Sequence, residues 1–174
     1  MEQRRSTETI RTVFGRNARA LSLRPALGQK TAVTTARIVD GLRCEVEEGR
    51  WKIVADTSEK SGGTGAGPDP GFIGRAALGA CLAMGYVTWA AHLHVPITRV
   101  EVELQADFDV RGQYGQDGVR PGYSEIRCLV HIESEAPEAD VRRVADTADA
   151  ASMYWDVFAN PVKLVRDLRV TKPS

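Results

Sequence analysis

The feature that most constrains the fold is a long apolar stretch that follows Asp69-Pro70. Aspartate is a favoured N-cap and proline a favoured first helical residue, so we expect a helix to start at Pro70. It can run to about His94 and must stop before Pro96. Its alanine-rich composition, with few charges on any face, predicts burial nearly all round. The apolar run 76–91 is shorter than the roughly 18 residues of a membrane span, so we expect a core helix and no membrane partner.

The segments after this helix alternate between apolar and polar residues, which is typical of strands with one buried face. Apolar residues occupy every even-numbered position of 100–110, and they recur at Ile126, Cys128, Val130 and Ile132. A glycine-rich link separates the two segments, and we expect them to pair as antiparallel strands. Upstream, the residues on either side of the turn Glu48-Gly49-Arg50 predict a hairpin.

The remaining elements complete an α+β fold. Residues 136–158 have helical composition and precede Asn160-Pro161, and 162–170 predict a last strand. Two helices segregated from antiparallel strands indicate the α+β class. A chain of 174 residues suits one domain, which we assign to 34–174, with 1–33 as an N-terminal arm or extension.

Composition excludes several kinds of partner. Lysine plus arginine and aspartate plus glutamate number 23 each, so no net charge draws the chain to nucleic acid. The cysteines are Cys44, Cys81 and Cys128, an odd number without CxxC spacing, which argues against a disulfide framework and a zinc site. The N-terminus lacks the apolar stretch of a secretory signal. We therefore expect a cytoplasmic protein.

Four motifs occur in order along the chain. They are the glycine loop Gly62-Gly63-Thr64-Gly65, then GPDPGFIGRAALGACLAMGY, PGYSEIRCLVHIESEAPE and ASMYWDVFANPV. Together, over roughly 34–170, they resemble the OsmC/Ohr family of osmotically inducible and organic hydroperoxide resistance proteins. The resemblance implies a stress-response protein with an OsmC-like fold, in which antiparallel sheets surround a long buried central helix. It also implies an intertwined homodimer with its reactive site at the subunit interface.

The resemblance further implies which residues would carry the chemistry. The peroxidatic cysteine of the family corresponds to Cys81, but its resolving cysteine falls on Ser152 and its catalytic glutamate falls on Gly71. The family's arginine corresponds to Arg37 or Arg43, although neither has the usual glycine-arginine context. The chain thus looks closer to the branch of the family that lacks the second cysteine.

Cys81 has two readings. As a peroxidatic residue it must be a thiolate, and it lies about three turns inside the helix, beyond the first turn where the dipole stabilises anions. An arginine from elsewhere would then be required. A sulfenic acid formed there would need a second thiol, which could come from Cys128 as an alternative thiol or from an external small thiol reductant. In the other reading, Cys81 is a small apolar core residue.

Other patterns carry weaker signals. The resemblance places the interface pocket, which would suit an apolar ligand, at four positions: Gly71, Tyr154, Trp155 and Phe158. Core packing or dimer contact is the alternative for the three aromatic residues. The glycine loop lacks the lysine of a P-loop, and His92 and His94 lack further ligands, so no cofactor and no metal are expected.

Two hypotheses of function remain. The first is a one-cysteine, thiol-dependent organic hydroperoxide reductase that uses Cys81, with Arg37 or Arg43 stabilising the thiolate. The second is a catalytically degenerate OsmC-like protein that binds a small apolar ligand at the dimer interface. The missing glutamate and resolving cysteine favour the second hypothesis, whereas the resemblance favours the first.

Overall fold

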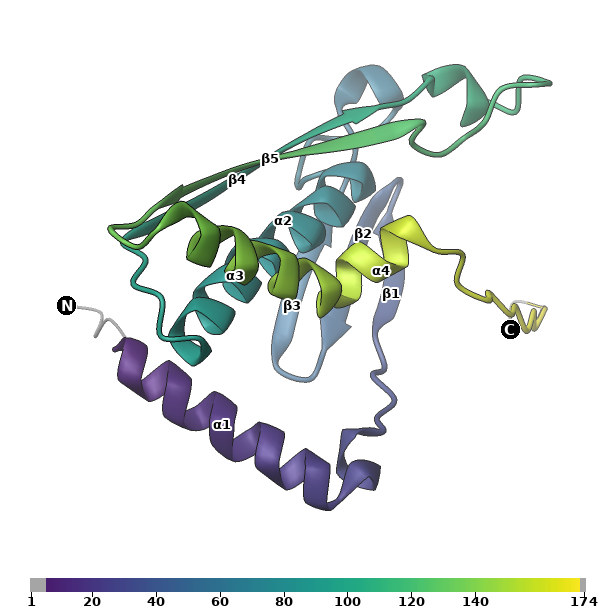
Figure 1. The fold of residues 1–174 in the computed structure, drawn as a ribbon. Coiled ribbons are helices and arrows are strands. Elements are labelled where there is room, and N and C mark those ends of the chain that lie inside the picture. The colour runs from purple at the N-terminus through teal and green to yellow at the C-terminus, as the bar shows by residue number, and fades with distance from the viewer. Residues whose placement is uncertain (1–5, 173–174) are drawn as a thin grey trace.

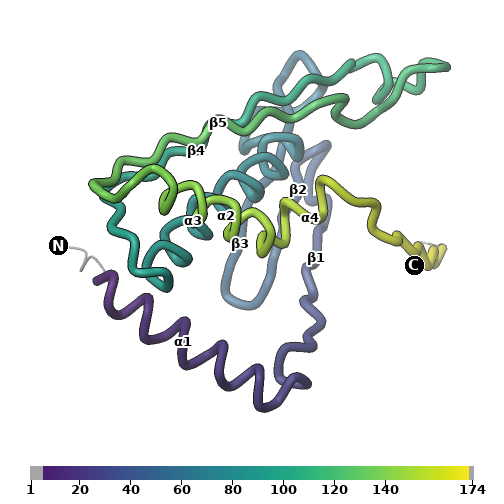
Figure 2. The backbone as a smooth tube through the Cα atoms, viewed as in Figure 1, coloured from purple at the N-terminus to yellow at the C-terminus, as the bar shows by residue number. Residues whose placement is uncertain are grey.

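The computed structural model describes residues 6–172, so residues 1–5 of the predicted arm and 173–174 of the predicted domain lie outside the described residues. Figures 1 and 2 show the course of the chain. The elements, in order, are α1 (Thr7–Leu23), η1 (Pro25–Gly28), β1 (Thr35–Asp40), β2 (Arg43–Glu48), β3 (Trp51–Ala55), η2 (Glu59–Ser61), α2 (Pro70–His92), β4 (Arg99–Asp107), η3 (Val110–Gly112), β5 (Glu125–Glu133), α3 (Glu138–Ala150) and α4 (Met153–Ala159). These helices and antiparallel strands confirm the α+β class.

The central helix α2 begins as the sequence predicts. The side chain of Asp69 accepts a hydrogen bond of 2.8 Å from the backbone N–H of Phe72, and Pro70 is the first helical residue. The helix ends at His92, two residues before the expected end. By length and composition alone α2 could cross a membrane, a test that core helices of soluble proteins also pass. In this fold it packs against β4, α3, α4 and α1.

The ribbon of β4 and β5 covers one side of α2 (Figure 1). The strands pair antiparallel from Arg99 opposite Glu133 to Asp107 opposite Glu125, as the alternation predicts. Residues of the inner face pack on a core formed by α2 and α3. The residues of this core are Leu78, Leu82, Tyr86 and Ala148, and those packed on it from the ribbon are Val100, Val102, Leu104, Ile126, Cys128 and Ile132.

The predicted hairpin is part of a three-stranded antiparallel sheet in the order β1-β2-β3. Gly49 has φ 57° in the turn between β2 and β3, a conformation that glycine adopts without a steric penalty. The sheet is not among the main packing partners of α2 within the described chain 6–172. Its apolar residues Ile38, Trp51 and Ile53 are therefore exposed in a single chain.

Two predicted elements differ from those observed. The single helix expected over 136–158 is two helices, because Ser152 adopts an extended backbone with φ −85° and ψ 117° and starts α4. The strand expected over 162–170 is absent from the described residues, where this segment has no regular structure and Leu164 is 91% exposed. An apolar segment with alternating residues forms a strand only where another strand accepts its hydrogen bonds.

The prediction of nearly all-round burial for α2 is wrong within a single chain. Five residues of the helix are buried, whereas Phe72 and Met84 are 53% and 70% exposed. The reason is that the ribbon, α3 and α4 cover one side of the helix and α1 packs on its C-terminal end, whereas among residues 6–172 the sheet β1–β3 is not a main packing partner of the helix.

The loop that leads into α2 is organised by one buried carboxylate, that of Asp56, which is 2% exposed. It accepts hydrogen bonds from the hydroxyl of Thr64 at 2.7 Å and from the backbone N–H groups of Thr57, Thr64 and Ala66. These bonds, that of the Thr64 hydroxyl first, hold the pKa of the Asp56 carboxyl far below its usual range. Gly63 lies against the backbone of Thr57. A Cβ at this position would be 2.2 Å from the carbonyl oxygen of Thr57, so a side chain does not fit there.

We expect Asp56→Asn to lower the melting temperature at neutral pH. Because the folded-state pKa of Asp56 is depressed, its contribution to stability is complete above the unfolded pKa of about 3.9 and is lost as the pH falls below it. The melting temperature of the variant should therefore depend less on pH between about 5 and 2 than that of the unmodified protein. Thermal unfolding followed by circular dichroism measures both. Equal pH dependence in the two proteins would contradict this role.

Candidate functional site

The centre of the site is a contact between Cys81 and Ser152. The Cys81 sulfur lies on α2, 3.4 Å from the hydroxyl oxygen of Ser152. Ser152 is 8% exposed and sits at the break between α3 and α4. Its hydroxyl oxygen accepts a hydrogen bond of 3.2 Å from the backbone N–H of Trp155, so the hydroxyl hydrogen is available to the sulfur. A donor in this position would stabilise a thiolate.

A second contact fixes the break in position. The hydroxyl of Tyr86, which is fully buried on α2, donates a hydrogen bond of 2.8 Å to Asp149 on α3. The backbone N–H of Ser152 in turn bonds to the carbonyl of Asp149. Burial raises the pKa of Asp149, and burial together with this hydrogen bond raises the pKa of Tyr86. The pair therefore connects α2 to α3 immediately before Ser152.

The structure does not bring the two candidate arginines to Cys81 within one chain. Arg37 and Arg43 lie on exposed positions of β1 and β2. Arg43 forms an ion pair with Glu45 at 3.9 Å. In the described residues Cys81 hydrogen-bonds only with Ser152. The roles of these arginines therefore remain predictions.

Arg75 is a cation near the site that the sequence reasoning missed. It donates a hydrogen bond of 2.8 Å to the hydroxyl of Tyr123, which itself donates to the carbonyl of Gly71. A Cβ at Gly71 would be 3.2 Å from the Arg75 guanidinium. The signal was present in the sequence, because Arg75 is the only Lys, Arg, Asp or Glu in α2, and a lone charge in an apolar helix requires a polar partner.

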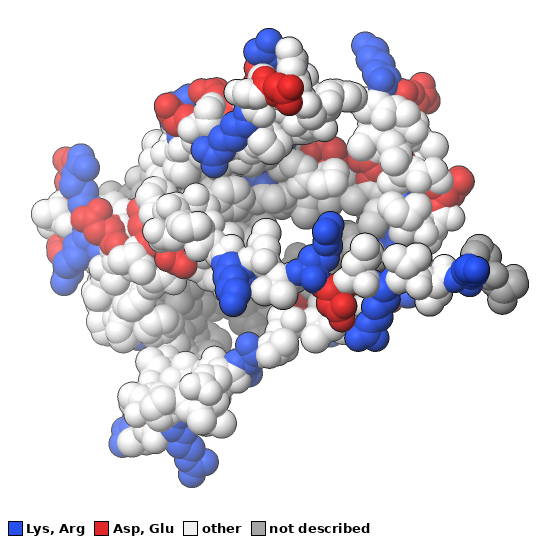
Figure 3. Space-filling view, turned by 90° about the vertical axis from the view of Figure 1, so that its right-hand side faces the viewer, with Lys and Arg blue, Asp and Glu red and all other residues white. Residues whose placement is uncertain are grey.

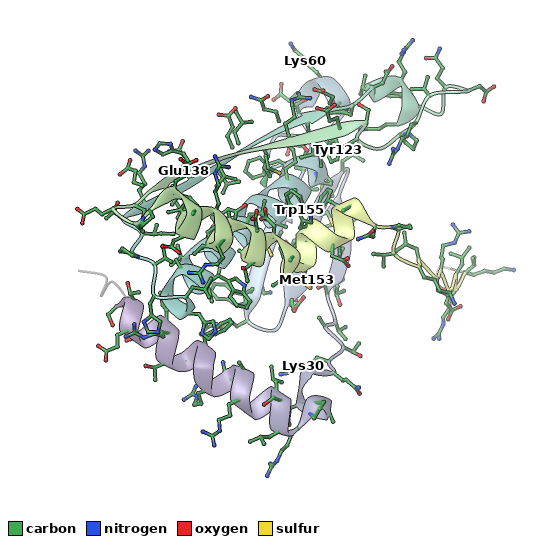
Figure 4. The ribbon with its side chains drawn as sticks, viewed as in Figure 1. Lys30, Lys60, Tyr123, Glu138, Met153 and Trp155 are labelled. Carbon is green, nitrogen blue, oxygen red and sulfur yellow. The ribbon has the colours of Figure 1, made fainter. Side chains whose placement is uncertain are left out.

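A cavity of about 430 Å³ opens beside Tyr123, which lines it. Figure 4 shows Tyr123 and Trp155 at this place, between the start of β5 and α4. The lining residues come from α2, from the segment 120–128 and from α4: Leu78, Arg120, Tyr123, Ser124, Glu125, Ile126, Cys128, Trp155, Phe158 and Ala159. Of the four predicted pocket positions, Trp155 and Phe158 line this cavity, whereas Tyr154 packs on the core and Gly71 borders Tyr123.

The rings of the pocket stack across different elements. Tyr123 stacks on Phe158 with ring centroids 6.5 Å apart, and Phe108 meets Tyr123 edge-on at 5.8 Å. These contacts join the end of β4 and the start of β5 to α4. Tyr123 and Phe158 thus contribute aromatic surface to a cavity that the polar residues Arg120, Ser124 and Glu125 also line.

Cys128 lines the cavity but is poorly suited to act as a second thiol. Burial raises the pKa of its thiol, and the negative charge of Asp149 adds to the shift. The thiolate, which is the reactive form, is therefore disfavoured. Cys128 forms no hydrogen bond with Cys81 in the part of the chain that is described.

The two histidines at the end of α2 contact the N-terminal helix. The ring of His92 lies 4.6 Å from that of Phe14, and Arg11 donates a hydrogen bond of 3.0 Å to Nδ1 of His94. Within residues 6–172, no group of three His, Cys, Asp or Glu side chains could hold a metal ion.

The model of the family described as OsmC-like protein matches residues 63–165, which include Cys81, Ser152 and the cavity. The chain belongs to the OsmC-like protein family. No curated protein sequence matches it.

Solved structures of OsmC-like proteins share the fold. An OsmC-like protein from Mycoplasma pneumoniae is 18% identical, with a TM-score of 0.63, and the match covers 75% of this chain and 89% of that one. An organic hydroperoxide resistance protein OsmC from Legionella pneumophila is 14% identical, with a TM-score of 0.53 and coverage of 74% and 89%. An OsmC-like hydroperoxide resistance protein from Jannaschia sp. CCS1 is 17% identical, with a TM-score of 0.51 and coverage of 78% and 89%. At these identities the matches show the fold alone.

We expect Ser152→Cys to form a disulfide with Cys81 on mild oxidation. The two side-chain atoms are already 3.4 Å apart, and a small rotation would bring two sulfurs to the bonding distance of about 2.05 Å. Mass spectrometry of non-reduced peptides measures the link. The unmodified protein and Ser152→Ala serve as controls, and neither should form it. A linked Cys81–Cys128 pair in place of the expected one would contradict this geometry.

Proposed function

We propose that this OsmC-like protein reduces small organic hydroperoxides with Cys81 as its nucleophile and an external thiol as reductant. The observation that carries the proposal is the hydrogen bond between Cys81 and the buried hydroxyl of Ser152. Hydroperoxide resistance is named for OsmC-like proteins of the same fold from Legionella pneumophila and Jannaschia sp. CCS1. Leu78 and Trp155, one turn from Cys81 and Ser152, line the cavity that would hold the organic group.

The reaction balances with one protein thiol. The Cys81 thiolate attacks the terminal oxygen of ROOH, the O–O bond breaks, and the leaving alkoxide takes a proton to become ROH. Cys81 is then a sulfenic acid. A first external thiol displaces water from it to form a mixed disulfide, and a second releases the Cys81 thiol as the external disulfide forms. Ser152 can donate a hydrogen bond to the attacking sulfur but cannot replace either external thiol.

We expect purified protein to consume cumene hydroperoxide in the presence of dithiothreitol, and Cys81→Ser to reduce the rate to that of buffer. Cys44→Ser is the matched control and should keep the rate within about twofold, since Cys44 lies on β2 and does not line the cavity. Ser152→Ala should lower the rate by about ten- to a hundredfold, because a hydrogen bond to a charged group contributes roughly 1.5–3 kcal/mol. Ser152→Thr, which keeps the hydroxyl, should restore most of it.

A second candidate function is the binding of a small apolar ligand in the cavity of about 430 Å³. The observation in its favour is that, within the described residues, Cys81 has no hydrogen bond to a cation. If neither the unmodified protein nor Cys81→Ser consumes cumene hydroperoxide, the reductase proposal fails. Binding of cumyl alcohol, which has the same organic group, would then support the second candidate.

We propose further that the working form is an intertwined homodimer. The solvent-accessible area of the chain is 14087 Å², whereas a compact monomer of this mass exposes about 8,400 Å². Support also comes from the exposed side of α2 and from the β1–β3 sheet, which has no helix to cover it within residues 6–172. A partner that covered both would bury the excess apolar area. It could also bring Arg37 or Arg43 to the site of the other subunit.

We expect sedimentation velocity at micromolar concentration to give twice the mass of the chain. Met84→Lys should shift the protein toward the monomer, because Met84 is 70% exposed on the uncovered side of α2. Leu129→Lys is the matched control, since Leu129 is 47% exposed on the outer face of the β4–β5 ribbon. A monomeric unmodified protein would rule out the dimer.

A further inference from the structure

The charge of this chain is segregated along the sequence. Between residues 9 and 39 there are six basic residues and no acidic residue. Since the whole chain has 23 of each, the remainder has six more acidic than basic residues. The six basic residues are Arg11, Arg16, Arg19, Arg24, Lys30 and Arg37. None of them forms an ion pair with a carboxylate in the described chain.

The first half of α1 is anchored to its own subunit. Phe14 packs against Trp89 and His92 with ring centroids 5.0 and 4.6 Å apart, and Arg11 bonds to His94. These contacts fix the helix across the C-terminal end of α2. They use the face of α1 that carries Phe14, so the opposite face remains free.

The second half of α1 extends away from the body (Figure 1). Arg16, Arg19 and Leu23 follow one another at spacings of three and four residues, which places them on one face of the helix. All three are exposed, Leu23 to 72%. In Figure 3 the lowest lobe, formed by the end of α1 and by η1, shows basic side chains and no acidic one. This outer face of α1 is basic with an apolar residue at its end, and it is exposed to solvent in the part of the chain that the structure describes.

We propose that the outer face of α1, formed by Arg16, Arg19 and Leu23, docks on the acidic body of a second copy of this chain. The inference rests on the proposed homodimer and adds a contact to it. Residues 7–28, which form α1 and η1, lie outside the residues 63–165 that match the family model.

Two observations favour a second copy over an anionic lipid surface. The charges are complementary within the chain itself, because the excess of six basic residues in 9–39 equals the excess of acidic residues elsewhere. The arm also leads directly into β1, whose sheet has an uncovered apolar face in the described residues. A partner subunit that covers this sheet would therefore lie beside the arm. Lys30, which Figure 4 labels, is in the short segment between η1 and β1.

The test is the double variant Arg16→Glu/Arg19→Glu in the full chain. We expect its dimer dissociation constant to rise about tenfold or more at low salt, because two attractive charges become repulsive. The dissociation constant of the unmodified protein should rise with NaCl from about 50 to 500 mM, and that of the variant should depend on salt much less. Arg142→Glu/Arg143→Glu on α3 makes the same change of charge outside the arm and should leave the dissociation constant within about twofold.

Three results would overturn the proposal. One is a variant that dimerises as the unmodified protein does, which would leave the homodimer itself intact. Another is an equal effect of the control variant, which would show that net charge rather than the arm is responsible. The third is an unchanged dimer together with loss of binding to phosphatidylserine vesicles, which would assign the arm to a lipid surface. Circular dichroism verifies that both variants are folded.

Leu23→Asp, which adds a negative charge to the outer face of α1 without changing an arginine, should also raise the dissociation constant of the dimer.

Discussion

The structure depends on how α2 is covered. The helix has 23 residues and only one Lys, Arg, Asp or Glu side chain. Most of its surface is therefore apolar, and removing that surface from water stabilises the fold. The β4–β5 ribbon, α3 and α4 cover one side of it. The ribbon supplies alternating apolar residues, α3 supplies Val144 and Ala148, and Tyr86 and Asp149 satisfy each other's polar groups between the two helices. The uncovered side accounts for the proposed dimer.

The same packing creates the candidate site. Cys81 is on the half of α2 that α4 approaches, and the break at Ser152 turns the chain so that a hydroxyl rather than an apolar side chain meets the sulfur. One oxygen caps α4 through Trp155 and contacts Cys81 at the same time. A structural requirement, the N-cap of a helix, therefore also places a hydrogen-bond donor beside a thiol.

Polar groups at the other end of α2 have a different role. Asp56 accepts hydrogen bonds from the glycine loop, and Asp69 caps the helix. The hydrogen bond from Arg75 to Tyr123 links the first turns of α2 to the start of β5. These bonds hold the glycine loop and the first turns of α2 in place, and none of them involves Cys81. Gly71 belongs to this group, because the space that its missing side chain leaves is bounded by Asp69, Arg75 and Tyr123.

Local patterns in the sequence determined much of the fold. Capping by Asp69 and Pro70 set the start of α2, and strict alternation set the pairing of β4 with β5. These features depend on residues close in the chain, or on one face of a strand, so a reader of the sequence can find them. The family resemblance assigned Cys81 to the peroxidatic position and Ser152 to the position of the resolving cysteine, and only the fold showed that the two side chains touch.

Tertiary structure alone decided the rest. Whether residues 136–158 form one helix or two depended on the turn at Ser152, and whether 162–170 form a strand depended on a neighbouring strand that a single chain does not provide. The cavity is formed by residues from α2, β5 and α4, which are far apart in sequence. Composition and periodicity specify what a segment can bury, but only the arrangement of the other segments decides what covers it.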